Sequence, residues 1–223
     1  MGIFSLGTAQ FGSAYGVKQD GQPDYFEVAR ILYLARWAGI DMVDTAPAYR
    51  HDADLREFKV VTKTPWDGSD CYAVLVHDPD GADRLPELRE QRGDMDVKIG
   101  ISVYTPDQMF EALRYNIEVI QIPLNIVDGR FLPYLSLLHD LNVEVHARSV
   151  FLQGALLMDD PPVDVPRLDV ETCLGYVLAQ DVDRVVVGVN SEMQLWELLH
   201  VPPKDAENYH LPESVVDPRG WGK

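Results

Sequence analysis

The sequence has 223 residues, of which 46% are hydrophobic and 25% are charged, and these ordinary globular proportions exclude wholesale disorder. Its 36 acidic residues outnumber its 19 basic residues, which gives a formal net charge of −17. A field of that sign repels phosphate backbones and disfavours general nucleic-acid binding, although it does not forbid a local pocket for one small anion.

Neither a signal peptide nor a membrane span is evident. The opening residues, MGIFSLGTAQFG, have no basic region and no long apolar run. No segment approaches the roughly 18 consecutive apolar residues that a membrane helix needs. Cys71 and Cys173 lie far apart and have no metal or redox spacing. We therefore expect a cytoplasmic protein with reduced thiols, no membrane association and no bound metal.

Eight short apolar segments predict β-strands, and several are continuously apolar, as is typical of parallel strands covered on both faces. They span residues 5–8, 42–45, 60–63, 73–77, 98–102, 119–123, 144–149 and 184–189. Segments with helical spacing and capping residues lie between most of them. These predict helices from the Asp24 cap to Gly39, over 83–92, from Thr105 to Leu113, and over 130–141, 170–179 and 191–199.

Two connections between predicted strands are unusually short. Residues 49–60 leave room only for a stub helix around 52–58, and residues 63–73 (KTPWDGSDCYA) leave room for none. The alternation of eight strands with helices predicts an α/β fold, a (β/α)8 TIM barrel with a stub second helix and a missing third helix. A doubly wound sheet would need a G-x-G-x-x-G turn after its first strand, which LGTAQFG is not. We expect one barrel domain over residues 1–200 and an irregular C-terminal tail over 201–223.

Ionisable residues end three consecutive predicted strands, namely Asp44, Lys63 and His77, and Tyr49 follows in the loop after Asp44. The carboxyl ends of barrel strands share one mouth, so these side chains should converge there. We expect the Lys63 ammonium to lower the pKa of Tyr49 toward neutral pH, which would make Tyr49 a general acid for a carbonyl oxygen. His77 would orient that oxygen by a hydrogen bond. Each residue alone has a structural explanation, whereas the four together favour a proton-transfer site.

Ordered motifs that cover almost the whole chain carry a resemblance to a known family. They are LGTAQFGSAYGV, GIDMVDTAPAY, TKTP, LVHDP, KIGIS, IQIPLNIVDGR, VHARSVFLQGALL and VVVGVNSEMQLWELL. With them the sequence resembles the aldo-keto reductases. LGTAQFG, NIVDGR, RSVFLQG and DPRGW are most similar to the branch linked to bacterial surface-polysaccharide and sugar-nucleotide genes.

The resemblance implies an oxidoreductase that reduces a small aldehyde or ketone, sugar-derived in the narrower branch, with Asp44, Tyr49, Lys63 and His77 as its catalytic tetrad. It also implies NADPH as the cofactor. The residues that would bind it are Ser102, Gln121, Arg148, Ser149, Phe151, Gly188, Asn190 and Gln194. The family commonly has a basic residue near the positions of Gly188 and Gln194, where this chain has none, so NADH is the alternative cofactor.

Two other functions stay open. A catalytically inactive, reductase-like barrel could act as a binding or scaffolding protein. A lyase or isomerase could use Lys63 as a Schiff-base amine, although an ion-paired lysine is a poor nucleophile. The flank without a helix would expose apolar strand faces, and we expect a homo-oligomer to form through it.

Overall fold

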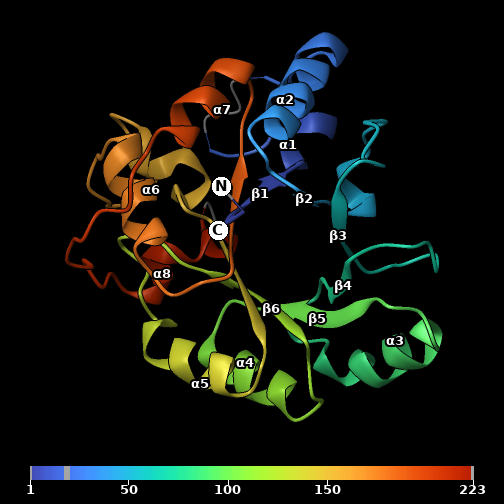
Figure 1. Ribbon diagram of the computed structural model, residues 1–223. Helices are drawn as coiled ribbons and strands as arrows, with labels where there is room; N and C mark the ends of the chain where they lie inside the picture. The colour runs from blue at the N-terminus through green and yellow to red at the C-terminus, as the bar shows by residue number, and fades with distance from the viewer. Residues whose placement is uncertain (1, 18–20, 222–223) are drawn as a thin grey trace.

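Eight parallel strands close into a barrel in the computed structural model, which describes residues 2–17 and 21–221 (Figure 1). The strands are β1 (Phe4–Gly7), β2 (Met42–Asp44), β3 (Lys59–Lys63), β4 (Ala73–Val76), β5 (Lys98–Ser102), β6 (Val119–Pro123), β7 (Glu144–Arg148) and β8 (Arg184–Gly188). Each strand pairs with the next, and β8 pairs with β1. The predicted (β/α)8 barrel is confirmed, and each predicted strand matches within one residue at either end.

In the described part of the chain, six α-helices of six or more residues surround the barrel (Figure 1), and a side-chain cap begins four of them. The α-helices are α1 (Ala9–Gly12), α2 (Tyr25–Trp37), α3 (Leu85–Arg92), α4 (Pro106–Leu113), α5 (Leu135–Asp140), α6 (Val170–Leu178), α7 (Glu192–Leu199) and α8 (Glu213–Val216). Asp24, Thr105, Asp169 and Ser191 each accept a hydrogen bond from a backbone N–H in the first turn of α2, α4, α6 and α7. These bonds satisfy backbone groups that have no partner within the helix.

Short 3-10 turns complete the connections. They are η1 (Pro47–Tyr49), η2 (Ala82–Arg84), η3 (Leu132–Tyr134), η4 (Leu152–Leu157) and η5 (Pro218–Gly220). Two helices predicted as continuous therefore begin as 3-10 turns, because η2 leads into α3 and η3 leads into α5.

The stub helix predicted around residues 52–58 is wrong, because the structure has only the turn η1 before that segment and no helix within it. Local side-chain bonds hold this segment in other conformations. The Asp54 carboxylate accepts from the backbone N–H of Arg56 at 3.2 Å and from its guanidinium at 2.6 Å, and His51 Nδ1 accepts from the Ala53 N–H at 3.3 Å. Such bonds compete with helical ones. The missing third helix is confirmed, since residues 64–72 contain no helix and loops flank β3 in Figure 1.

Buried apolar residues fill both sides of the strand wall. One cluster contains Met42, Val61, Ala73, Leu75 and Val119, which come from β2, β3, β4 and β6, and a larger cluster joins the strands to the helices. Alternation along each strand sends successive side chains to opposite faces of the wall. The packed interior leaves the carboxyl ends of the strands as the place where polar side chains can gather.

The segment after residue 201 folds back over the barrel. The backbone N–H groups of Tyr209 and Leu211 donate to Ile126 O and Val127 O at 2.9 and 3.0 Å. The segment ends in α8 and η5, and residues 222 and 223 of the predicted tail lie outside the described residues. The boundary at residue 200 stays a prediction. Within residues 2–17 and 21–221, none of the helices has the length and hydropathy needed to cross a lipid bilayer.

Candidate active site

A buried ion pair lies at the mouth of the barrel. Asp44 ends β2 and Lys63 ends β3, and both residues are buried, with exposed fractions of 4% and 2%. Lys63 Nζ donates to both carboxylate oxygens of Asp44, at 2.6 and 2.7 Å, and Gln121 Nε2 donates to Asp44 Oδ2 at 2.8 Å. Buried charges persist when they are paired and hydrogen-bonded, and both conditions hold here.

Tyr49 lies beside this pair, on the turn η1. Its ring centroid is 5.6 Å from Lys63 Nζ. The pKa of Tyr49 is raised, first by burial and then by the negative charge of Asp44. The expectation that Lys63 lowers this pKa is therefore wrong, because the Asp44 carboxylate contacts Nζ directly and offsets its charge. Tyr49 is a protonated phenol throughout the neutral pH range.

His77 follows β4 and is exposed at the same mouth. Its backbone N–H donates to Thr64 Oγ1 at 3.1 Å, and within the described ranges its imidazole has no hydrogen-bond partner. Partial desolvation and the charge of Lys63 lower the pKa of His77. The imidazole is thus neutral at neutral pH and is available to donate a hydrogen bond to a ligand.

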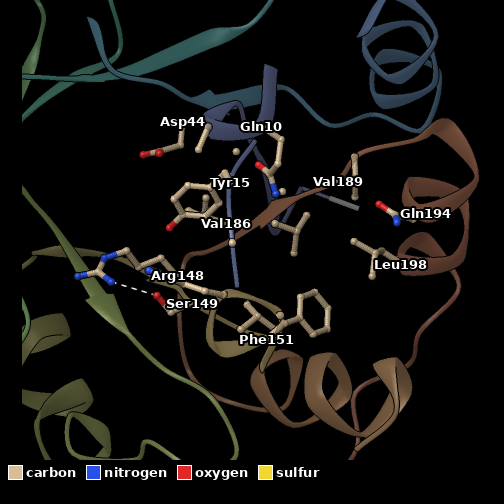
Figure 2. A pocket seen from close by; sticks show the side chains of 18 of the residues that line it. Gln10, Tyr15, Asp44, Arg148, Ser149, Phe151, Val186, Val189, Gln194 and Leu198 are labelled. Atoms are coloured by element: carbon tan, nitrogen blue, oxygen red, sulfur yellow. Dashed lines mark hydrogen bonds between the residues drawn. The ribbon is translucent and has the colours of Figure 1, made fainter. Parts of the chain in front are cut away.

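A chain of hydrogen bonds links the ion pair to the seventh strand. Ser102 Oγ donates to Gln121 Oε1 at 3.3 Å, and Arg148 Nε donates to Ser102 Oγ at 3.2 Å. Arg148 Nη1 continues the chain to Ser149 Oγ at 3.0 Å (Figure 2). Side chains from β2, β6, β5 and β7 are therefore held in one network around the mouth, which fixes their orientation.

Arg148 brings a positive charge to this network. Among the described residues no carboxylate lies within 4.0 Å of its guanidinium, whose Nη2 donates to Val103 O at 2.9 Å. Its Cζ is 4.1 Å from the ring centroid of Tyr104, and Cζ of Arg219 is 3.7 Å from the same centroid. Sequence reasoning missed Arg219, although it noted the motif DPRGW that contains this residue.

A cavity of about 350 Å³ runs from the barrel mouth to helix α7 (Figure 2). Two of the four predicted catalytic residues line it, Asp44 and Tyr49. Six of the eight predicted cofactor residues also line it, namely Gln121, Arg148, Ser149, Phe151, Gly188 and Gln194. The cavity thus connects the ion-pair end of the site with the β8–α7 connection.

The other predicted residues lie behind the cavity wall or beside it. Ser102 is 4% exposed and contacts Gln121 and Arg148, while Lys63 contacts Asp44. Asn190 lies between β8 and α7, where its N–H donates to Gln194 Oε1 at 2.7 Å. Its own Oδ1 is buried and has no hydrogen-bond partner among the described residues. A buried acceptor without a hydrogen-bond donor costs free energy in the folded protein.

Two polar residues that sequence reasoning did not assign, Gln10 and Gln153, also line the cavity, as does Tyr15. Gln10 and Tyr15 belong to the LGTAQFGSAYGV segment after β1, so their position in a βα loop was the available signal. Burial raises the pKa of Tyr15, whose hydroxyl faces the side of the cavity that holds Arg148 in Figure 2. Nowhere in residues 2–17 and 21–221 do three potential metal ligands gather.

His51 anchors the loop that carries Tyr49. Its Nε2 lies 2.9 Å from Thr8 Oγ1 and 3.0 Å from Thr45 Oγ1, which follow β1 and β2. Because its Nδ1 accepts from the Ala53 N–H, the proton of the neutral ring is on Nε2. The pKa of His51 is lowered by burial. This contact ties the loop to two strand ends in a connection that lacks a helix.

Gly12 sets the approach of α1 to the same loop. A Cβ at this position would overlap the carbonyl group of Tyr49, so the close contact between α1 and η1 requires glycine. The Tyr49 backbone is thus held from one side by α1 and from the other by the His51 anchor.

Comparisons with known proteins show what this architecture is similar to. No family model matches the sequence, and no curated protein matches it significantly. A Pseudomonas aeruginosa structure assigned as an aldo-keto reductase matches with a TM-score of 0.70 and 20% identity, over 90% of this chain and 89% of the other. The holo form of the aldo-keto reductase AKR11C1 from Bacillus halodurans matches with a TM-score of 0.66 and 20% identity, over 93% and 89%. A thermostable aldo-keto reductase in complex with the inhibitor epalrestat matches with a TM-score of 0.63 and 17% identity, over 93% and 92%. The chain therefore has the fold of the aldo-keto reductases.

Proposed function

We propose that this protein is an oxidoreductase of the aldo-keto reductase type that reduces an aldehyde or ketone with a nicotinamide cofactor. The observation that carries the proposal is the buried Asp44–Lys63 pair beside Tyr49, at one end of the cavity that runs to α7. The shared fold and the ordered sequence motifs support it. A sugar-derived substrate and a location in the cytoplasm stay predictions.

The residues of the cavity fit an extended dinucleotide. Polar side chains from Gln121 to Gln194 line its length. Ser149 and Phe151 lie along the middle, and Gly188 has no side chain to narrow the passage. The two cavity ends therefore match a nicotinamide at Arg148 and an adenosine at α7. A bound nicotinamide cofactor would supply the hydride that the carbonyl carbon accepts.

Tyr49 would donate the proton that the carbonyl oxygen needs as it becomes an alcohol. Its raised pKa keeps the phenol protonated before the step. As the proton leaves Tyr49 Oη, the Arg148 guanidinium, whose charge lowers the pKa of Tyr49, would stabilise the phenolate. His77 would donate a hydrogen bond to the carbonyl oxygen and hold it toward Tyr49. Solvent at the mouth would then return a proton to the phenolate.

One observation favours the alternative, a barrel that binds or scaffolds without turnover. A groove of about 1290 Å³ runs along the uncovered flank of β3, where Phe58, Val60 and Trp66 line it. The Schiff-base alternative is disfavoured, because Lys63 contacts both oxygens of a buried carboxylate and an ion-paired ammonium is not a nucleophile.

Titration of the protein with NADH and with NADPH, followed by the fluorescence of its four tryptophans, tests the proposal. Binding of at least one dinucleotide is expected, and no binding of either at millimolar concentration would refute the reductase. Phe151→Ala should weaken dinucleotide affinity about two- to tenfold, since an aromatic contact contributes roughly 0.5–1.5 kcal/mol. Phe110→Ala is the matched control, because Phe110 lies on α4 outside the barrel and packs on Tyr134.

A further inference from the structure

The N-terminus of α7 already holds a carboxylate from elsewhere in the chain. The Glu192 N–H, in the first turn of α7, donates to Glu27 Oε1 at 2.6 Å. Glu27 lies in the first turn of α2, where its own N–H donates to Asp24 Oδ1 at 2.8 Å. Helices α2 and α7 lie side by side (Figure 1). The free N–H groups at a helix start attract anions, and here an internal anion satisfies one of them.

This helix end borders the cavity. Gln194, Glu197 and Leu198 of α7 line it, and Figure 2 shows Gln194 and Leu198 at the end away from Arg148. The proposed function puts the nicotinamide near Tyr49 and Arg148. A dinucleotide that extends from there along the cavity must bring its adenosine ribose to the first turn of α7.

The charges at this end oppose a phosphate on the adenosine ribose. Arg148 is the only positively charged residue among the described residues that line the cavity, and it lies at the end near Tyr49. Glu197 lines the α7 end. The neighbouring Arg30 is not free, because its Nη1 donates to Glu27 Oε2 at 2.7 Å. Among the described residues, a phosphate dianion on the ribose would meet carboxylates without a free cation, while a ribose hydroxyl would meet hydrogen-bond acceptors.

We propose that Glu27 makes this cavity select NADH over NADPH, an inference that rests on the proposed function. Glu27 occupies one of the N–H groups that would otherwise attract a phosphate, and it neutralises the charge of Arg30. Its carboxylate also repels a phosphate on the adenosine ribose. The sequence resemblance implied NADPH with NADH as the alternative, and the contacts of Glu27 favour the alternative.

Calorimetric titration of the full chain with four ligands tests this selection. NADH and NADPH differ by one phosphate, as do AMP and adenosine 2′,5′-bisphosphate. Wild type should bind NADH at least about tenfold more tightly than NADPH, which corresponds to about 1.4 kcal/mol. Glu27→Gln keeps an acceptor for the Glu192 N–H but loses the charge, so it should tighten NADPH binding about three- to thirtyfold and leave NADH binding unchanged.

Two further variants make the result specific. Glu87→Gln removes the same charge from the first turn of α3, where Glu87 is exposed, and should leave both affinities unchanged. Arg30→Met leaves Glu27 unneutralised and should weaken NADPH binding further, which tests the proposal even if Glu27→Gln folds poorly. The bisphosphate should follow NADPH in every variant, and AMP should follow NADH.

The outcomes separate the two proposals. Equal or tighter binding of NADPH by wild type would overturn the selection and leave the reductase intact. An unchanged affinity ratio in both Glu27→Gln and Arg30→Met would overturn the role of Glu27. Binding of none of the four ligands would overturn the proposed function, and the inference with it.

Discussion

Replacing one member of the buried Asp44–Lys63 pair should destabilise the protein far more than replacing one member of an exposed pair. Lys63→Met leaves Asp44 buried, with Gln121 as its remaining side-chain partner. Breaking a buried pair on one side commonly costs about 3–5 kcal/mol. The side chains are only 3% and 6% exposed, so little solvent screening reduces that figure.

The same strands provide a matched control. Lys59, at the other end of β3, pairs with Asp41 before β2 at 2.8 Å, but these side chains are 50% and 43% exposed. Lys59→Met should cost at most about 1 kcal/mol. Because a buried pair can often be replaced entirely at little cost, Asp44→Asn combined with Lys63→Met should be less destabilised than the sum of the two single variants, by about 2–3 kcal/mol.

Urea denaturation of the four variants and wild type measures these differences as free energies of unfolding. Equal losses in Lys63→Met and Lys59→Met would show that burial does not govern the pair. Additive losses in the double variant would show that the two side chains do not act on each other, which would refute the electrostatic account of the site.

Gly12→Ala should displace Tyr49, because the new Cβ overlaps the Tyr49 carbonyl, and we expect it to lower the unfolding free energy by about 1–3 kcal/mol and to reduce turnover. Gly220→Ala is the control, because Gly220 has open space around it and its substitution should change neither quantity. A Gly12→Ala variant with full activity would contradict the contact between Gly12 and Tyr49. The pKa of His51 lies below the ordinary histidine value of 6.5, because burial disfavours the charged ring, so the folded state loses stability as the pH falls through 6.5 toward the folded pKa. Unfolding free energies across that range should therefore fall more steeply with acid in wild type than in His51→Gln, and equal slopes would count against the anchor. Self-association through the β3 flank stays a prediction: light scattering should show a dimer that Val60→Lys weakens, and a wild-type monomer would exclude it.

The barrel could be predicted because its signals are local. Uninterrupted apolar runs mark the strands. Capping residues such as Thr105 and Ser191 mark helix starts, because each accepts a hydrogen bond from the N–H of the residue three positions later. The segment 52–58 could not be predicted in the same way. Its Asp54–Arg56 and His51–Ala53 hydrogen bonds are local too, but they compete with helical hydrogen bonds, and sequence patterns do not reveal which set is more stable.

The candidate site shows a sharper limit. Strand-end positions were enough to choose Asp44 and Lys63, and the loop that follows β2 was enough to choose Tyr49, since the barrel brings strand ends and their loops together. The direction of the Tyr49 pKa shift depends on which charge lies closer to which atom, and only the three-dimensional structure supplies those distances. The hydrogen bond from the Glu192 N–H to Glu27 joins positions 165 residues apart and involves a backbone group, so no sequence pattern predicts it.

The central claim is that Tyr49 is the acid of a carbonyl reduction at the barrel mouth. Its most direct test is the steady-state turnover of a panel of aldehydes and ketones by wild type and Tyr49→Phe, with Tyr33→Phe as control because Tyr33 is exposed on α2. We predict that Tyr49→Phe loses at least about 100-fold in kcat, the lower end of what a positioned acid contributes, and keeps its dinucleotide affinity. Turnover in Tyr49→Phe equal to that of wild type would contradict the account.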